Sequence, residues 1–236
     1  MFSAITPFAG EAPFNDWFTP DSTQRHALGL TITAVDPYWG QGEFIYLKSN
    51  AAVLKGSLVV WNEGYLSVLL PNTANQGFPF GVAMTNAASG VNFWAQISGR
   101  AVYKTNATVA ADAAIGIAAA GIAGTNAAGK QLLGVRNVTS ATGTVTVSAN
   151  TLTGSGVLTT NGYDGFFLGA ALSGTGVPAS TVVAGLSSDG KTILMGSAIG
   201  TFDKLATASG QITLTGTYTG YGSGMLNRSF CQGAIT

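Results

Sequence analysis

GEFIYLKS, residues 42–49, is the stretch of sequence that decides the fold class. In an extended strand, side chains alternate between two faces, which puts Phe44 and Tyr46 on one face. Ile45 and Leu47 fall on the other. Because neither face is cleanly polar, the pattern predicts a strand with a core on one side and an interface with another chain on the other.

Similar short runs, rich in β-branched and aromatic residues, recur between glycine, asparagine and proline up to about residue 141. They are LGLTITAV, GSLVVWN, YLSVLL, FGVAMT, VNFWAQIS, RAVYKT and LLGVRNV. A spacing of roughly 8–12 residues between such runs is typical of all-β proteins. We therefore expect an all-β chain in which residues 29–141 form a β-barrel or β-sandwich body.

The alanine-rich stretch 109–123 is the one place where a helix competes, because alanine has the highest helix propensity. Gly116 and Gly121 interrupt it, so we expect extended, loop-like chain there. After about residue 142 the composition shifts to Thr, Ser, Gly, Val and Leu, in alternating runs joined by Asn-Gly and Asp-Gly turns. These runs predict a second, small β-sandwich-like module at 142–223, followed by a short C-terminal tail at 224–236.

Residues 1–28 contain prolines and scattered aromatic residues without helical or strand periodicity, which predicts an extended N-terminal arm. Aromatic side chains on such an arm need another surface to cover them. We favour a neighbouring subunit, and the alternative is that the arm wraps its own domain. The Tyr38-Trp39 pair is a further anchor, for the core or for an interface. The candidate partner-interface residues are Phe2, Phe8, Phe14, Trp17, Phe18, Tyr38 and Trp39.

The composition favours association and argues against several classes of function. Only 8% of the residues are charged and the formal net charge is zero, so little repulsion keeps copies or partners apart. Residues 1–140 carry seven Lys or Arg and seven Asp or Glu, and the remainder carries three of each. Without a cationic cluster we expect no nucleic-acid partner. The start lacks the features of a secretory signal, and the apolar stretch 109–124 is too short to span a bilayer, so we expect no membrane association.

Motifs that suggest catalysis or cofactors occur in the wrong context. The string GLSSDGKT, residues 185–192, has the spacing of a phosphate-binding loop, but β-branched, glycine-interrupted sequence follows it where a helix is needed. His26 is the only histidine and has no ligand partner at metal spacing, and Cys231 is the only cysteine. The ten acidic residues are dispersed, so a carboxylate pair could arise only through folding. We therefore predict no enzyme activity and no catalytic, cofactor-binding or metal-binding residues.

Three segments of the body carry a resemblance to a known class. They are GEFIYLKSNAAVLKGSLVVWN (42–62), the segment 81–115, which begins GVAMTNAASGVNFWAQIS and ends KTNATVAADAAI, and LLGVRNVTSAT (132–142). Their order of strands and small-residue turns resembles virion structural proteins of tailed phages, notably capsid decoration (cement) proteins. The later segment 166–198, with its SGTGVPASTVV string, is similar to a β module of phage structural proteins.

The resemblance implies a homo-oligomer, often a trimer, that binds the outer surface of the capsid and clamps neighbouring subunits of the major capsid protein. It brings no catalytic site. One alternative is a tail, fibre or receptor-binding component of the virion, although long repeats and heptads typical of fibres are absent from the sequence. Another is a carbohydrate-binding β protein, for which aromatic residues are present but clustered carboxylates are not.

Overall fold

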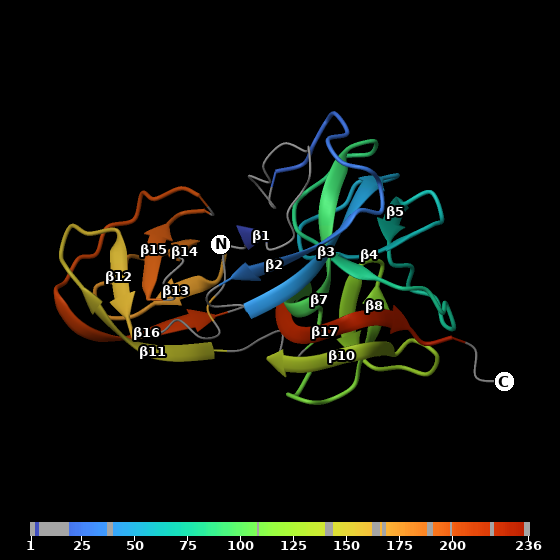
Figure 1. Cartoon of the computed structure of the whole chain (residues 1–236). Coiled ribbons are helices and arrows are strands. Elements are labelled where there is room, and N and C mark those ends of the chain that lie inside the picture. The colour runs from blue at the N-terminus through green and yellow to red at the C-terminus, as the bar shows by residue number, and fades with distance from the viewer. Residues whose placement is uncertain are drawn as a thin grey trace. The chain divides into compact units, whose positions relative to one another are not determined.

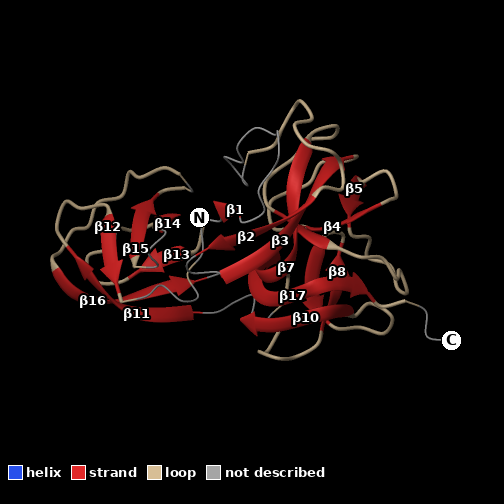
Figure 2. Ribbon diagram, in the orientation of Figure 1, coloured by secondary structure: helices blue, strands red, loops and turns tan. Residues whose placement is uncertain are grey.

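The structure is a computed structural model in which every described element is a β-strand (Figure 1 and Figure 2). It describes residues 3–4, 19–36, 40–107, 109–139, 144–161, 166, 169–187, 191–198, 200–217 and 220–233. These residues belong to two compact units, one within 142–219 and a larger one within 2–141 and 220–236. The prediction of an all-β fold is confirmed.

The larger unit is built around one nine-stranded sheet, in the order β1-β2-β3-β5-β4-β6-β7-β17-β10. Its strands are β1 (Ser3–Ala4), β2 (Thr31–Asp36), β3 (Gly40–Ser49), β4 (Leu58–Trp61), β5 (Leu66–Leu69), β6 (Gly81–Ala83), β7 (Asn92–Lys104), β10 (Leu132–Thr139) and β17 (Tyr221–Cys231). Because β3 also pairs with β7, the five strands β3, β5, β4, β6 and β7 close into a ring. The expected barrel-like body is confirmed.

Both faces of β3 are buried by this chain itself. Ile45 and Leu47 pack inside the ring, in a cluster to which all five ring strands contribute. Phe44 and Tyr46 pack on the outside of the ring, in a second cluster with β2 and with Trp94. The expected interface with another chain on one face of this strand was therefore wrong, because the chain's own β2 and the segment before it cover that face.

A third cluster fills the space between the outer side of β4 and β6 and the strands β7, β10 and β17. The hairpin of β8 (Ile115–Ala119) and β9 (Ile122–Thr125) contributes Ile115 and Ile117 to it. The alanine-rich stretch is thus not a helix, as expected, but it forms a strand pair instead of a loop. Gly121 lies at the turn with φ of +69°, a conformation that favours glycine.

The smaller unit is a closed six-stranded barrel in the order β11-β12-β15-β14-β13-β16. Its strands are β11 (Thr144–Thr151), β12 (Val157–Thr160), β13 (Ala171–Ser173), β14 (Thr181–Leu186), β15 (Thr192–Gly196) and β16 (Gly210–Thr217). Leu158, Val183, Ile193, Met195 and Leu214 are fully buried. The expected second β module is confirmed, and it is a closed barrel because β16 pairs with both β11 and β13.

The barrel sequence is inserted between two strands that pair with each other. β10 and β17 run antiparallel from Leu132↔Cys231 to Thr139↔Ser223, and the ends of the barrel pair at Thr144↔Thr217. The expected C-terminal tail at 224–236 is therefore mostly strand β17, bonded to β7 and β10 on its two sides. Its small residues hid it in the sequence, and they are needed because Gly224 lies against the Tyr103 ring and the Arg136 backbone.

Candidate functional site: a bulged pocket on the larger unit

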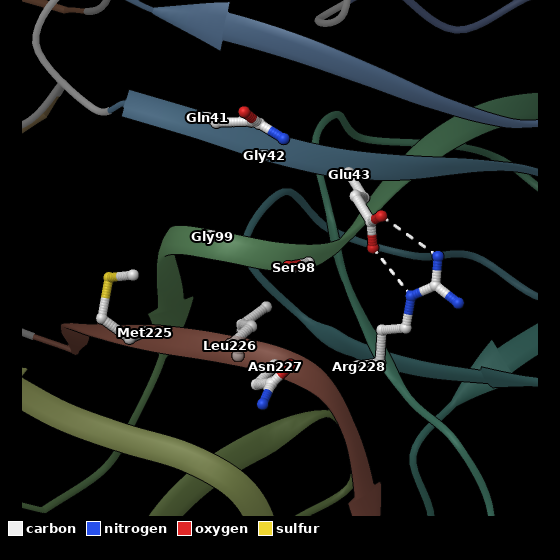
Figure 3. A pocket seen from close by; sticks show the side chains of 9 residues that line it. All are labelled: Gln41, Gly42, Glu43, Ser98, Gly99, Met225, Leu226, Asn227 and Arg228. Carbon is white, nitrogen blue, oxygen red and sulfur yellow. Dashed lines mark hydrogen bonds and ion pairs between the residues drawn. The ribbon is translucent and has the colours of Figure 1, made fainter.

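A shallow pocket of about 500 Å³ opens on β3, β7 and β17 of the larger unit (Figure 3). Its lining residues are Gln41, Gly42, Glu43, Ser98, Gly99, Met225, Leu226, Asn227 and Arg228. A cavity of this size falls within the range of small-ligand sites, about 300–1,000 Å³. We treat this concave surface as the candidate site.

Irregularities in neighbouring strand pairs create the pocket. The register between β3 and β7 shifts between Glu43 and Phe44, and the register between β10 and β17 shifts between Leu133 and Val135. Gly99 adopts φ of +88°, and a Cβ atom there would overlap the Gln41 carbonyl oxygen. Bulges of this kind bend strands and redirect side chains, and they are common beside functional sites.

The bulge in β17 redirects Arg228 across β7 toward β3. Arg228 has φ of +44°, which is unusual for a residue with a side chain. Ser229 donates a hydrogen bond from its hydroxyl to the Gly134 carbonyl at 2.9 Å, which supports the bulge. The Arg228 guanidinium donates two bonds to the Glu43 carboxylate, at 2.8 and 3.1 Å. Figure 3 shows the two side chains facing each other from β17 and β3.

The ion pair makes the pocket neutral overall. The hydrogen bond from Arg228 holds the pKa of Glu43 below its usual range, against a smaller opposing effect of burial. Glu43 therefore stays ionised at neutral pH, where Arg228 is also charged. A single carboxylate already paired with arginine does not resemble the carboxylate pair of a glycosidase. The pocket has polar groups for binding but no nucleophile-and-base pair.

His26, the only histidine of the sequence, lies elsewhere in the larger unit, where its ring packs against two aromatic rings. Its centroid lies 5.1 Å from that of Tyr46 and 5.4 Å from that of Trp94. The Tyr46 hydroxyl donates a 2.8 Å hydrogen bond to Asp21, which also pairs with Arg25 at 2.9 Å. Burial is the main reason that the pKa of Tyr46 is raised. These contacts fix residues 21–26 on the outside of the ring.

Cys231 and the phosphate-loop-like string 185–192 suggested chemistry in the sequence, but their described residues lie in strands or directly beside them. Cys231 is buried, and burial raises the pKa of its thiol to about 11, so it is a poor nucleophile. In the phosphate-loop-like string, Thr192 begins strand β15 and not a helix; residues 188–190 lie outside the described part. The described residues hold no group of three or more potential metal ligands.

All seven predicted partner-interface residues lie outside the described residues. They are Phe2, Phe8, Phe14, Trp17, Phe18, Tyr38 and Trp39. Their role stays a prediction. Sequence reasoning in turn missed the pocket, because Glu43 and Arg228 are 185 positions apart and their meeting depends on two bulges. No signal in the sequence alone pairs them.

Comparisons of the chain with protein-family models, with curated proteins and with solved structures find no match. In the described part of the chain, no helix is long and apolar enough to cross a membrane.

Proposed function

We propose that this chain is a structural component of a virus particle, a decoration protein that binds the outer surface of a tailed-phage capsid. In this role it contacts the major capsid protein and copies of itself, with a trimer favoured, and it stabilises the junctions between capsid subunits. It acts through buried surface and not through catalysis. The sequence resemblance supports the location, and the low charge of the chain supports permanent assembly.

One observation carries the proposal: the small barrel exposes a set of large apolar side chains. Leu152, Phe202 and Leu205 are 66%, 57% and 52% exposed. Small barrels usually turn such groups inward, and exposed apolar patches commonly mark contacts with other proteins. These side chains are therefore suited to burial in an assembly.

Two of these side chains, Phe202 and Leu205, form one patch with Val157 and Leu194, which we call the barrel patch. Val157 and Leu194 are paired across β12 and β15. Gly185 brings Leu194 and Phe202 together, since a Cβ on that glycine would lie about 3 Å from both. Leu205 lies beside Gly156, next to Val157 in the chain. Glycines thus let the segment 202–205 lie flat on the barrel strands.

The charges beside the barrel patch are already engaged within the barrel. Asp203 accepts hydrogen bonds from the Ser197 backbone N–H at 2.6 Å and from its hydroxyl at 2.7 Å. These bonds lower the pKa of Asp203. Lys204 donates to the Ala179 carbonyl at 3.3 Å. A partner can therefore cover the apolar side chains without meeting a carboxylate or ammonium that has no partner.

Co-sedimentation of the purified protein with capsids that lack it tests the proposal. We expect the protein to sediment with capsids, and the double variant Phe202→Ser with Leu205→Ser to sediment much less. Leu54→Ser is the matched control, because Leu54 is also about half exposed, at 54%, but lies on the larger unit. Failure of the unaltered protein to bind capsids overturns the proposal. If the double variant and Leu54→Ser bind capsids equally well, the exposed apolar side chains of the barrel do not contact the capsid and the proposal loses its main support.

The predicted arm needs a narrower test than removal of residues 1–28. That deletion also removes Asp21 and His26, whose contacts with Tyr46 belong to the fold of the larger unit. A deletion of residues 1–18 retains both. If the arm anchors the protein, this shorter deletion abolishes capsid sedimentation while the tryptophan emission of the folded unit is retained. Undiminished sedimentation contradicts a role for the arm.

A further inference from the structure

We propose that the pocket on β3, β7 and β17 binds a neutral saccharide ring. This inference goes beyond the proposed particle function and does not depend on where on a particle the chain lies. Carbohydrate binding was one alternative function from the sequence, which indicated no site for it. We now assign it a site. The charge, the hydrogen-bonding groups and the lining of the pocket support this assignment.

The charge of the pocket selects against ionic ligands. Glu43 and Arg228 already hold each other through two hydrogen bonds. An anion at the guanidinium would lie beside the Glu43 carboxylate, and a cation at the carboxylate would lie beside the Arg228 guanidinium. Either ligand would meet a like charge at short range. A neutral ligand leaves the pair intact.

The polar groups around the pair both donate and accept hydrogen bonds. Gln41 and Asn227 are exposed and carry amide groups that do both, and Ser98 adds a hydroxyl. The ion pair uses Nε and one terminal nitrogen of Arg228, so the other terminal nitrogen remains for a ligand. Adjacent hydroxyl groups of a sugar have the same dual character and match planar side chains of this kind.

The accessible lining of the pocket is more apolar than polar, so a ligand here needs an apolar face as well as polar groups. Met225 is 45% exposed and supplies a flexible apolar wall. Gly99 has no side chain, which lets the backbone of Gln41 and Gly42 approach β7 closely beside the pocket. A sugar ring has polar edges and apolar C–H faces, so one face can rest on Met225 while its hydroxyls meet the polar groups.

The backbone conformation of Arg228 is unusual for a residue with a side chain. A side-chain-bearing residue with φ of +44° costs folding free energy, and such residues concentrate at functional sites. A second exposed ion pair, between Arg136 and Asp112, also contains a residue with positive φ, because Asp112 has φ of +61°. It involves β10 and the segment before β8 and lines no part of the pocket. It therefore provides a matched control.

The test is an NMR titration of the isotope-labelled full chain with the methyl glycosides of glucose, galactose, mannose and N-acetylglucosamine. We expect at least one of them to shift the amide signals of Gly42, Ser98, Gly99 and Asn227. A parallel titration with oligosaccharides of the same sugars distinguishes a free sugar or chain end from a polysaccharide as the natural ligand. A response to the single sugar indicates a free sugar or a chain end, and a response only to the oligosaccharide indicates a polysaccharide.

Two variants decide whether the pocket is responsible. Glu43→Gln leaves Arg228 without its counter-charge, so we expect at least a tenfold loss of affinity for the neutral sugar and a gain of affinity for glucuronate. Arg136→Ala should bind as the unaltered protein does. The proposal is overturned if no sugar shifts these amides, or if Glu43→Gln binds the neutral sugar as well as Arg136→Ala does.

Discussion

Both units of this chain are β-structures with mostly antiparallel pairing, but their register shifts lie beside different surfaces. In the barrel, β11 and β16 pair over eight consecutive positions, from Thr144↔Thr217 to Thr151↔Gly210, without a shift. In the larger unit, the registers of β3 with β7 and of β10 with β17 both slip. The barrel has a shift of its own, between Val183 and Gly185 of β14, next to the barrel patch. In the larger unit the shifts lie beside a pocket that contains an ion pair and amide groups. The side chains around the shifts, and not the shifts alone, separate the two surfaces.

Removing one leucine from each core provides the largest expected effect and tests whether the units are independent. Leu47 and Leu158 are both fully buried, one inside the ring and one inside the barrel. Changing either to alanine should cost its own unit about 2–5 kcal/mol of unfolding free energy. All four tryptophans lie outside 142–219, so tryptophan fluorescence in a denaturant titration reports on the larger unit. Leu47→Ala should shift that transition and Leu158→Ala should not. A shift of equal size in both would show that the units unfold together.

A buried polar contact gives the next largest effect, in the larger unit alone. Tyr103 donates to Asn137 at 2.7 Å, and Asn137 donates to the carbonyls of Val109 and Ala110 at 2.9 and 2.8 Å. Asn137→Ala should cost about 3 kcal/mol of unfolding free energy, because several buried groups lose their partner. Asn126→Ala, at an exposed position, is the control. Equal denaturation midpoints for the two variants would contradict this assignment.

Excision of the barrel should change the larger unit little. Because Thr139 and Ser223 are paired, a short glycine-containing turn in place of 142–219 can join β10 to β17. We expect the shortened chain to give an NMR spectrum in which the amide signals of Gly42 and Ser98 are retained. A collapsed or poorly dispersed spectrum would mean that the larger unit needs the barrel in order to fold.

The smallest effect concerns pH and the ion pair of the pocket. The pKa of Glu43 is lower in the folded chain than its ordinary value of 4.5. The pair therefore contributes stability that is present above pH 4.5 and is lost as the pH falls through the lower, folded pKa. Acid titrations of the unaltered protein and of Glu43→Gln should show a slightly steeper loss of stability below pH 4.5 in the former. Identical slopes would mean that Arg228 does not stabilise the ionised form of Glu43.

The sequence predicted what depends on local pattern. Alternation in residues 42–49 and the turn-separated runs after residue 142 were enough for an all-β chain. The same alternation gave a wrong interface, because the burial of Phe44 comes from β2 and Trp94, which no local pattern connects. β17 was missed because glycine and serine weaken a strand signal. Gly224 is nevertheless needed in the strand, because a side chain there would lie too close to the Tyr103 ring.

The candidate site could not be predicted for the same reason. Glu43 and Arg228 meet only because β7 lies between their strands and because β17 bulges at residues 227–229. A bulge depends on how two distant strands pair, and single-sequence patterns carry little information about register. The aromatic arm residues were chosen from composition, and they lie outside the described residues.

A reconstruction of capsid particles that carry this chain tests the proposed function most directly. We expect density for both β units on the outer capsid surface, at junctions between major capsid subunits, with the barrel patch facing a protein neighbour. Density for the chain on the tail, or a barrel patch open to solvent in every copy, would contradict the proposal.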